Sequence, residues 1–132
     1  MDRLLILCVA LLISFQMVLP AMAADAPAGR QKKLFHVVSI KFKETATEEQ
    51  IAAVEQAFVA LKTQIPGILS LDWGTNVSTE QRDKGFTHCF VLTFATDKDR
   101  DAYLVHPAHK AFGQLFGPVK DDVMVIDFWS QE

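Results

Sequence analysis

The segment LFHVVSIKF at residues 34–42 and the segment FTHCFVLTF at residues 86–94 decide the fold. In both, apolar side chains alternate along a run rich in Val, Ile and Phe, which is typical of half-buried β-strands. One face of each strand carries a single histidine among apolar residues, His36 on the first and His88 on the second. The full faces are Leu34, His36, Val38, Ile40 and Phe42, and Phe86, His88, Phe90, Leu92 and Phe94.

Helices and two further strands are predicted around these segments. The sequence TEEQ at residues 47–50 is a capping box that begins a helix, and Pro66-Gly67 stops it at about Gln64. Thr96 begins a second helix, and Pro107 suits the first position of a new one. The predicted elements are a strand at 34–42, a helix at 47–64, strands at 68–74 and 86–94, helices at 96–105 and from 107, and a strand at 123–129. This βαββαβ order predicts a ferredoxin-like α+β fold with the helices on one face of an antiparallel sheet.

The opposite face of the predicted sheet is also apolar. Phe35 and Val37 on one strand, and Cys89 and Val91 on another, point away from the helices if the histidine faces point towards them. In a monomer this surface would be exposed to water, whereas a second subunit would cover it. We therefore expect a homodimer that buries sheet against sheet.

Residues 1–23 are interpreted as a signal peptide. Arg3 precedes an apolar run over residues 4–19, and PAMA at residues 20–23 has small residues at the spacing that a signal peptidase recognises. Cleavage would remove Cys8 and leave Cys89 as the only thiol, so no internal disulfide is expected. Residues 24–33 predict a flexible leader. We therefore expect an exported protein, periplasmic or secreted, without stable membrane insertion; a retained amino-terminal anchor is the alternative.

The composition excludes several kinds of partner. The 132 residues include 13 Lys and Arg against 16 Asp and Glu, so the net charge of −3 provides no basic excess for nucleic acid. Half of the residues are hydrophobic, which suits one compact domain with a sizeable core. Phosphate-binding loops, dinucleotide fingerprints and serine nucleophile motifs do not occur in the sequence. We therefore expect neither a nucleic-acid partner nor a cofactor.

Four polar side chains are predicted to gather between the helices and the sheet: His36, His88, Tyr103 and His109. A buried imidazole stays neutral and can accept a proton, and a phenol can donate a hydrogen bond to a developing oxyanion. Phe58 and Phe90 would line the same pocket, which would be apolar with a few polar groups, as sites for small molecules usually are. The alternative is structural, with both strand histidines hydrogen-bonded in the core and Tyr103 a core residue with a wet hydroxyl.

The remaining histidine, His106, is assigned to helix capping. His106 and His109 have a spacing that metal sites use, but Pro107 restricts this segment. No neighbouring Cys or carboxylate cluster completes a coordination shell, so a metal site is not expected. Cys89 lies on the strand face opposite His88, which excludes a nucleophilic pair of these two residues.

Four segments together resemble the stress-responsive dimeric α+β barrel (Dabb) family: HVVSIKFK at 36–43, WG at 73–74, GFTH at 85–88 and YLVHPAH at 103–109. The resemblance extends over residues 34–130. It implies ferredoxin-like subunits joined into a β-barrel dimer. The chain also resembles the cofactor-free polyketide cyclases of this family, whose pocket groups match His36, His88, Tyr103 and His109 residue by residue.

This resemblance implies a small apolar ligand, aromatic or polyketide-like. As an enzyme, the protein would be an exported cyclase or lyase without a cofactor. His109 would be the general base, and Tyr103, His36 and His88 would donate hydrogen bonds to an enolate oxygen. The alternatives are a binding protein without turnover, a stress-related dimer without a ligand, and a haem or quinol monooxygenase of the same dimeric fold.

Overall fold

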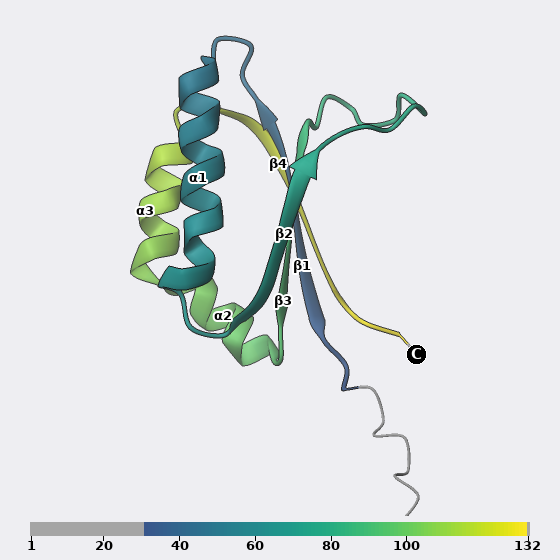
Figure 1. Cartoon of the computed structure of the whole chain (residues 1–132), viewed down its shortest axis with the longest axis vertical. Coiled ribbons are helices and arrows are strands. Elements are labelled where there is room, and N and C mark those ends of the chain that lie inside the picture. Colours follow the sequence, from purple (N-terminus) through teal and green to yellow (C-terminus); the bar gives the residue numbers. More distant parts are fainter. Residues whose placement is uncertain (1–30, 132) are drawn as a thin grey trace, which may run out of the picture.

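Seven helices and strands make up residues 31–131, the part of the chain that the computed structural model describes (Figure 1). In chain order they are β1 Leu34–Phe42, α1 Glu48–Gln64, β2 Ile68–Thr75, β3 His88–Phe94, α2 Asp97–Val105, α3 Pro107–Phe116 and β4 Lys120–Trp129. The predicted signal peptide at 1–23 and most of the predicted leader at 24–33 lie outside the described residues.

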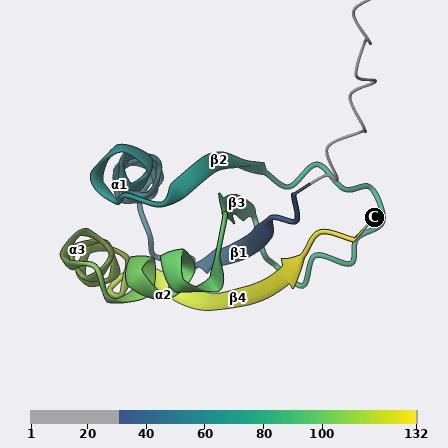
Figure 2. The ribbon, with the colours of Figure 1, turned by 90° about the horizontal axis from the view of Figure 1, so that it is seen from below.

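The four strands form one antiparallel sheet in the order β2-β3-β1-β4. All three helices lie on one face of this sheet, and the other face is left open (Figures 1 and 2). The element order and the strand order are those of the ferredoxin-like fold, which confirms the predicted fold class.

The helix boundaries follow from local capping chemistry. The Thr47 side chain accepts a hydrogen bond from the Gln50 backbone, and the Gln50 side chain accepts one from the Thr47 backbone, which completes the predicted capping box. His106 Nδ1 accepts from the Ala108 backbone at 3.1 Å, and Pro107 takes the first position of α3. The capping role of His106 is therefore confirmed. None of the helices in the described part of the chain has the length and apolarity that a membrane crossing requires.

Two predicted strand boundaries were wrong. The strand predicted from Phe86 begins at His88, because the Phe86 backbone N–H donates to the Asp83 carbonyl in the preceding turn. The strand predicted from Val123 begins at Lys120, and its first residues pair with the end of β1 across a register shift. The first residues of β4 are charged, so a search for apolar alternation does not include them in the strand. A strand at the edge of a sheet tolerates such charges.

The core lies between the helices and the sheet, as the alternation predicts. Its fully buried side chains come from α1, β1, β3 and α2, among them Ile40, Val54, Phe58, Leu61, Phe90, Leu92, Phe94 and Tyr103. On the open face, Phe35 and Phe128 stack with their ring centroids 5.0 Å apart. Met124, Ile126 and Phe128 on β4 are 43%, 50% and 48% exposed. An apolar sheet face is therefore left open to solvent in the single subunit.

Candidate functional site

His36 is the buried polar residue at the centre of the site. It is 4% exposed, because alternate residues of β1 share one face and its neighbours Leu34 and Val38 belong to the core. The pairing of β1 with β4 places Asp127 directly opposite, and Asp127 Oδ1 lies 2.6 Å from His36 Nδ1. Since a carboxylate only accepts, His36 Nδ1 carries the proton. In the neutral ring the other nitrogen, Nε2, is the acceptor.

Asp127 is itself held from helix α2. Its second oxygen accepts a hydrogen bond from Arg100 Nη1, and Arg100 Nε donates to Asp101 Oδ1 at 2.7 Å. The hydrogen bond to Asp101, and then that to Asp127, raise the pKa of Arg100. The side chains of Arg100 and Asp127 are 21% and 27% exposed, so this pair lies at the rim of the site.

Tyr103 contacts His36 from helix α2. The two ring centroids are 5.5 Å apart in an edge-on arrangement, and Tyr103 is 1% exposed. Burial raises the pKa of its phenol well above the ordinary value, so the hydroxyl keeps its proton at neutral pH. Every fully buried side-chain nitrogen or oxygen in residues 31–131 has a hydrogen-bond partner, whereas the Tyr103 hydroxyl has none there. The protonated hydroxyl can therefore donate a hydrogen bond to a ligand that reaches it.

His109 stands next to Tyr103, with 4.5 Å between the ring centroids. Its Nδ1 donates to the Leu104 carbonyl at 3.2 Å, which leaves Nε2 as the acceptor nitrogen. Burial lowers the pKa of His109 more than the hydrogen bond to the Leu104 carbonyl raises it, so its ring is neutral at pH 7. We name His36, Arg100, Tyr103, His109 and Asp127 the His36 cluster.

His88 lies in a different environment. Its Nε2 is 2.9 Å from Glu55 Oε1 on α1, and its Nδ1 is 2.8 Å from the Thr87 hydroxyl. The ring packs edge-on against Phe42 and is parallel to the ring of Trp73. Because both ring nitrogens are occupied, His88 has no free acceptor for a proton. We name Glu55, Thr87 and His88 the His88 cluster.

The structure separates the two strand histidines that the sequence placed in one pocket. On β1 and β3, His36 pairs with Leu92, whereas His88 pairs with Ile40. Four residues of strand separate these positions, which is roughly 13 Å at about 3.3 Å per residue. Of the four predicted polar groups, the structure brings together His36, Tyr103 and His109 and leaves out His88.

The predicted ligand-contacting residues Phe58 and Phe90 fill space in the core. Their rings stack at 3.9 Å, and both residues are 1% exposed. Trp73 stacks with Phe90 at 5.3 Å, and Phe112 packs edge-on against Phe58 at 4.8 Å. In the described structure these two phenylalanines are core packing beside the His36 cluster.

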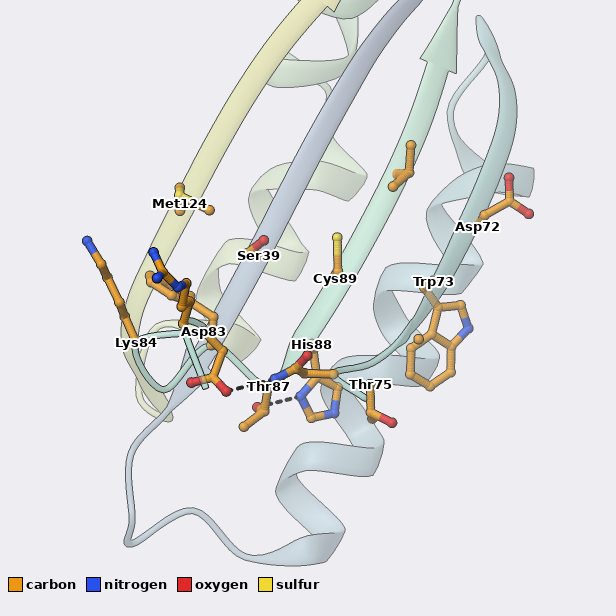
Figure 3. Close-up of a pocket in the computed structure, with 15 residues that line it drawn as sticks. Ser39, Asp72, Trp73, Thr75, Asp83, Lys84, Thr87, His88, Cys89 and Met124 are labelled. Carbon is orange, nitrogen blue, oxygen red and sulfur yellow. Dashed lines mark hydrogen bonds between the residues drawn. The ribbon is translucent and has the colours of Figure 1, made fainter. Parts of the chain in front are cut away.

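A hollow of about 610 Å³ lies beneath the loop between β2 and β3 (Figure 3). Its floor includes Ser39, Cys89 and Met124, which belong to the open face of the sheet. Arg82 and Lys84 of the loop contribute to its wall. It is therefore on the side of the sheet away from the His36 cluster. The sequence did not predict it, because residues 76–85 have no periodicity that would place them over the sheet.

Within residues 31–131, no group of three His, Cys, Asp or Glu side chains is placed to hold a metal ion. The His106 nitrogen is taken by its capping bond. Cys89 is a free thiol, half-buried on the open face.

Four residues of these clusters were missed from the sequence: Asp127, Arg100, Glu55 and Thr87. Asp127 is the one charged residue among the apolar residues 123–129, and that isolation was an available signal. It becomes informative only when the strand order places β4 beside β1, opposite His36. Arg100 and Glu55 lie on helix surfaces among many other charged residues, where no pattern distinguishes them.

Comparison with known proteins agrees with the fold. Residues 34–130 match the family model described as Stress responsive A/B Barrel Domain. Olivetolic acid cyclase of Cannabis sativa is 29% identical over 93 residues, which cover 70% of this chain and 92% of the cyclase. The stress-response A/B barrel domain-containing protein HS1 of Arabidopsis thaliana is 33% identical over 93 residues, which cover 70% of this chain and 85% of HS1.

Solved structures share the fold. The crystal structure of At3g17210 from Arabidopsis thaliana has a TM-score of 0.71 at 31% identity and covers 75% of this chain and 96% of its own. A protein from Jannaschia sp. CCS1, described as a dimeric ferredoxin-like protein of unknown function, has a TM-score of 0.65 at 25% identity. It covers 73% of this chain and 97% of its own.

Proposed function

Because this chain belongs to the stress responsive A/B barrel domain family, we propose that it is a cyclase-like or lyase-like enzyme that needs no cofactor. The substrate would be a small apolar carbonyl compound bound at the His36 cluster. A relative whose name is olivetolic acid cyclase, 29% identical to this chain, supports chemistry of this type.

The observation that carries the proposal is the pairing of Tyr103 with His109. A protonated phenol without a hydrogen-bond partner in the described residues stands beside a neutral imidazole whose Nε2 is an acceptor. A general base must be neutral to take a proton, and an oxyanion stabiliser must carry one to donate. The two side chains are in the complementary protonation states that proton abstraction next to a carbonyl requires.

In the proposed step, His109 Nε2 takes a proton from the carbon next to the substrate carbonyl. The electron pair of that C–H bond forms the enolate double bond, and the negative charge moves to the carbonyl oxygen. The Tyr103 hydroxyl donates a hydrogen bond to this oxygen, and His36 lies against the Tyr103 ring. Return of the proton from His109 to carbon completes a simple exchange. In an aldol cyclisation the enolate carbon attacks a second carbonyl, and the resulting alkoxide takes the proton from His109, so neither route involves net oxidation.

We propose that the protein is a homodimer joined through the open face of the sheet. The exposed Met124, Ile126 and Phe128 and the stacked Phe35 support this assembly. The description of the Jannaschia protein as dimeric supports it as well. Sedimentation at micromolar concentration tests the proposal, with the dimer expected for the unmodified chain and dissociation for Ile126→Asp; a stable monomer of the unmodified chain would contradict it.

We also propose that the protein is exported. The charged start, apolar run and small residues of positions 1–23 support this proposal. Expression of the full chain in a bacterium, followed by fractionation and amino-terminal sequencing, tests it. We expect a mature chain that begins at Ala24 outside the cytoplasm. Recovery of the uncleaved chain in the membrane fraction would favour the retained anchor.

The stacking of Phe58 on Phe90 favours a second candidate, a stress-related dimer without turnover. A core filled by these rings leaves less room beside Tyr103 than an enzyme for large substrates needs. The name of HS1, a stress-response protein 33% identical to this chain, is in keeping with this candidate.

Proton–deuterium exchange distinguishes the candidates. The probe is butyrophenone in deuterated buffer, and NMR follows the loss of the proton signal next to its carbonyl. We expect the protein to accelerate exchange over buffer and His109→Ala to abolish the acceleration. Absence of acceleration, together with absence of binding, would leave the non-catalytic candidate. The absorbance spectrum of the purified protein separately tests for haem.

A further inference from the structure

Arg100 lies within the His36 cluster, yet the proposed reaction does not use it. It precedes Tyr103 by three residues on α2, so both side chains lie on the same face of that helix. From this position its guanidinium reaches across to β4 and donates to Asp127. Of the salt bridges within residues 31–131, only this one joins α2 to the sheet.

The guanidinium is anchored at two points. Nε donates to Asp101 and Nη1 donates to Asp127, and the planar group holds these two donors in a fixed relation. The Asp127 carboxylate has one donor on each oxygen, His36 on Oδ1 and Arg100 on Oδ2, so it cannot rotate without losing a hydrogen bond. Arg100 therefore restricts the orientation in which Asp127 meets His36.

This orientation decides which nitrogen of His36 is protonated. The 2.6 Å contact between Asp127 Oδ1 and Nδ1 keeps the proton on Nδ1. If the carboxylate turned away, the neutral ring would exchange its proton between Nδ1 and Nε2. In the Nε2–H form, His36 Nε2 would be a hydrogen-bond donor, whereas in the Nδ1–H form it is an acceptor.

We propose that Arg100 is a positioning residue that fixes the Asp127 carboxylate and thereby holds His36 in its Nδ1–H form beside Tyr103. The consequence for turnover rests on the proposed function. The protonation site of His36 does not, because it can be measured on the resting protein.

The test is ¹⁵N NMR of the histidine rings in the full chain, because nitrogen shifts differ strongly between protonated and unprotonated ring nitrogens. In the neutral ring of the unmodified protein, His36 should be protonated at Nδ1 alone. Arg100→Met, which keeps the length and removes the charge, should populate the Nε2–H form. Lys98→Met, which removes an exposed charge from the same helix, should leave the spectrum unchanged. An unchanged His36 spectrum in folded Arg100→Met would overturn the proposal.

Arg100→Lys keeps the test decisive if the methionine variant does not fold. A lysine supplies charge without the planar pair of donors, so we expect a smaller but measurable Nε2–H population. A His36 spectrum identical to that of the unmodified protein would then reject the positioning role.

Turnover gives a second readout where exchange of butyrophenone is observed. We expect Arg100→Met to lower kcat by about tenfold with little change in KM, since it misorients a group without removing a substrate contact. If the unmodified protein does not turn over, the proposed function fails while the ring spectrum still decides the role of Arg100.

Discussion

The His36 cluster and the His88 cluster start from the same sequence feature, one histidine on an apolar strand face, and differ in what surrounds the ring. His36 has one nitrogen bonded to Asp127, and its ring lies against Tyr103. His88 has one nitrogen bonded to Glu55 and the other to Thr87. The first ring has an acceptor nitrogen when it is neutral, whereas both nitrogens of the second are occupied, Nε2 by Glu55 of α1 and Nδ1 by the adjacent Thr87.

This difference shows that burial of a histidine does not by itself indicate a site. A buried polar group must be satisfied, and a ring that is fully satisfied within the protein has the properties of a structural residue. The functional signal is hydrogen-bonding capacity that the described residues do not use, as at the Tyr103 hydroxyl. The two clusters should therefore differ in their effects on activity, stability and titration.

The largest expected effect is on turnover. Tyr103→Phe removes the donor to the enolate oxygen and should slow deuterium exchange of butyrophenone by about 10²–10³-fold, as loss of one oxyanion donor does elsewhere. The matched change in the other cluster, His88→Gln, should leave the rate close to that of the unmodified protein. Equal losses in the two variants would contradict the division into two clusters.

Stability should respond in the opposite way. His88→Ala removes the ring that packs on Phe42 and leaves Glu55 without its partner, which should lower the free energy of unfolding by about 2 kcal/mol. His109→Ala removes a half-buried ring with one backbone hydrogen bond and should cost less. Urea unfolding of both variants measures the difference, and a larger loss for His109→Ala would reverse the assignment.

Tyr103 should resist ionisation. It is the only tyrosine in the sequence, so the phenolate absorbance reports this residue alone. Burial raises its pKa above the ordinary value of 10.0, and the folded chain should stay protonated where the urea-unfolded chain ionises. Because the unfolded state then holds fewer protons, stability should fall as the pH rises above 10. Identical titration of the folded and unfolded chains would show that the hydroxyl is not in a buried environment.

A smaller effect is expected from His109 in mild acid. Its pKa is lowered by burial from the ordinary 6.5, so below that pH the unfolded chain takes up a proton that the folded chain does not. The stabilisation that comes from the neutral His109 ring is fully present above pH 6.5. The free energy of unfolding should decrease as the pH falls from 6.5 towards the lower pKa of the folded state. His109→Gln should remove this part of the slope in a series of urea titrations; an unchanged slope would assign it to other groups.

The sequence predicted the fold and only part of the site, for a physical reason. Alternation shows which face of a strand a residue occupies, so His36 and His88 were both correctly placed towards the helices. Alternation does not show how far along a strand pair two residues lie, because the register depends on loop geometry. The pairing of His36 with Leu92 and of His88 with Ile40 is what separates them. The partners Asp127 and Glu55 were missed for the same reason, since their importance comes from elements distant in sequence.

The most direct test of the account is a titration of the protein with butyrophenone, followed by the ring proton signals of its four histidines. Each histidine reports one environment: His36 and His109 the candidate site, His88 the other cluster, and His106 a helix cap. We predict that the signals of His36 and His109 shift as the ligand binds, while those of His88 and His106 stay in place. Shifts confined to His88, or no shift of any histidine at millimolar ligand, would contradict the account.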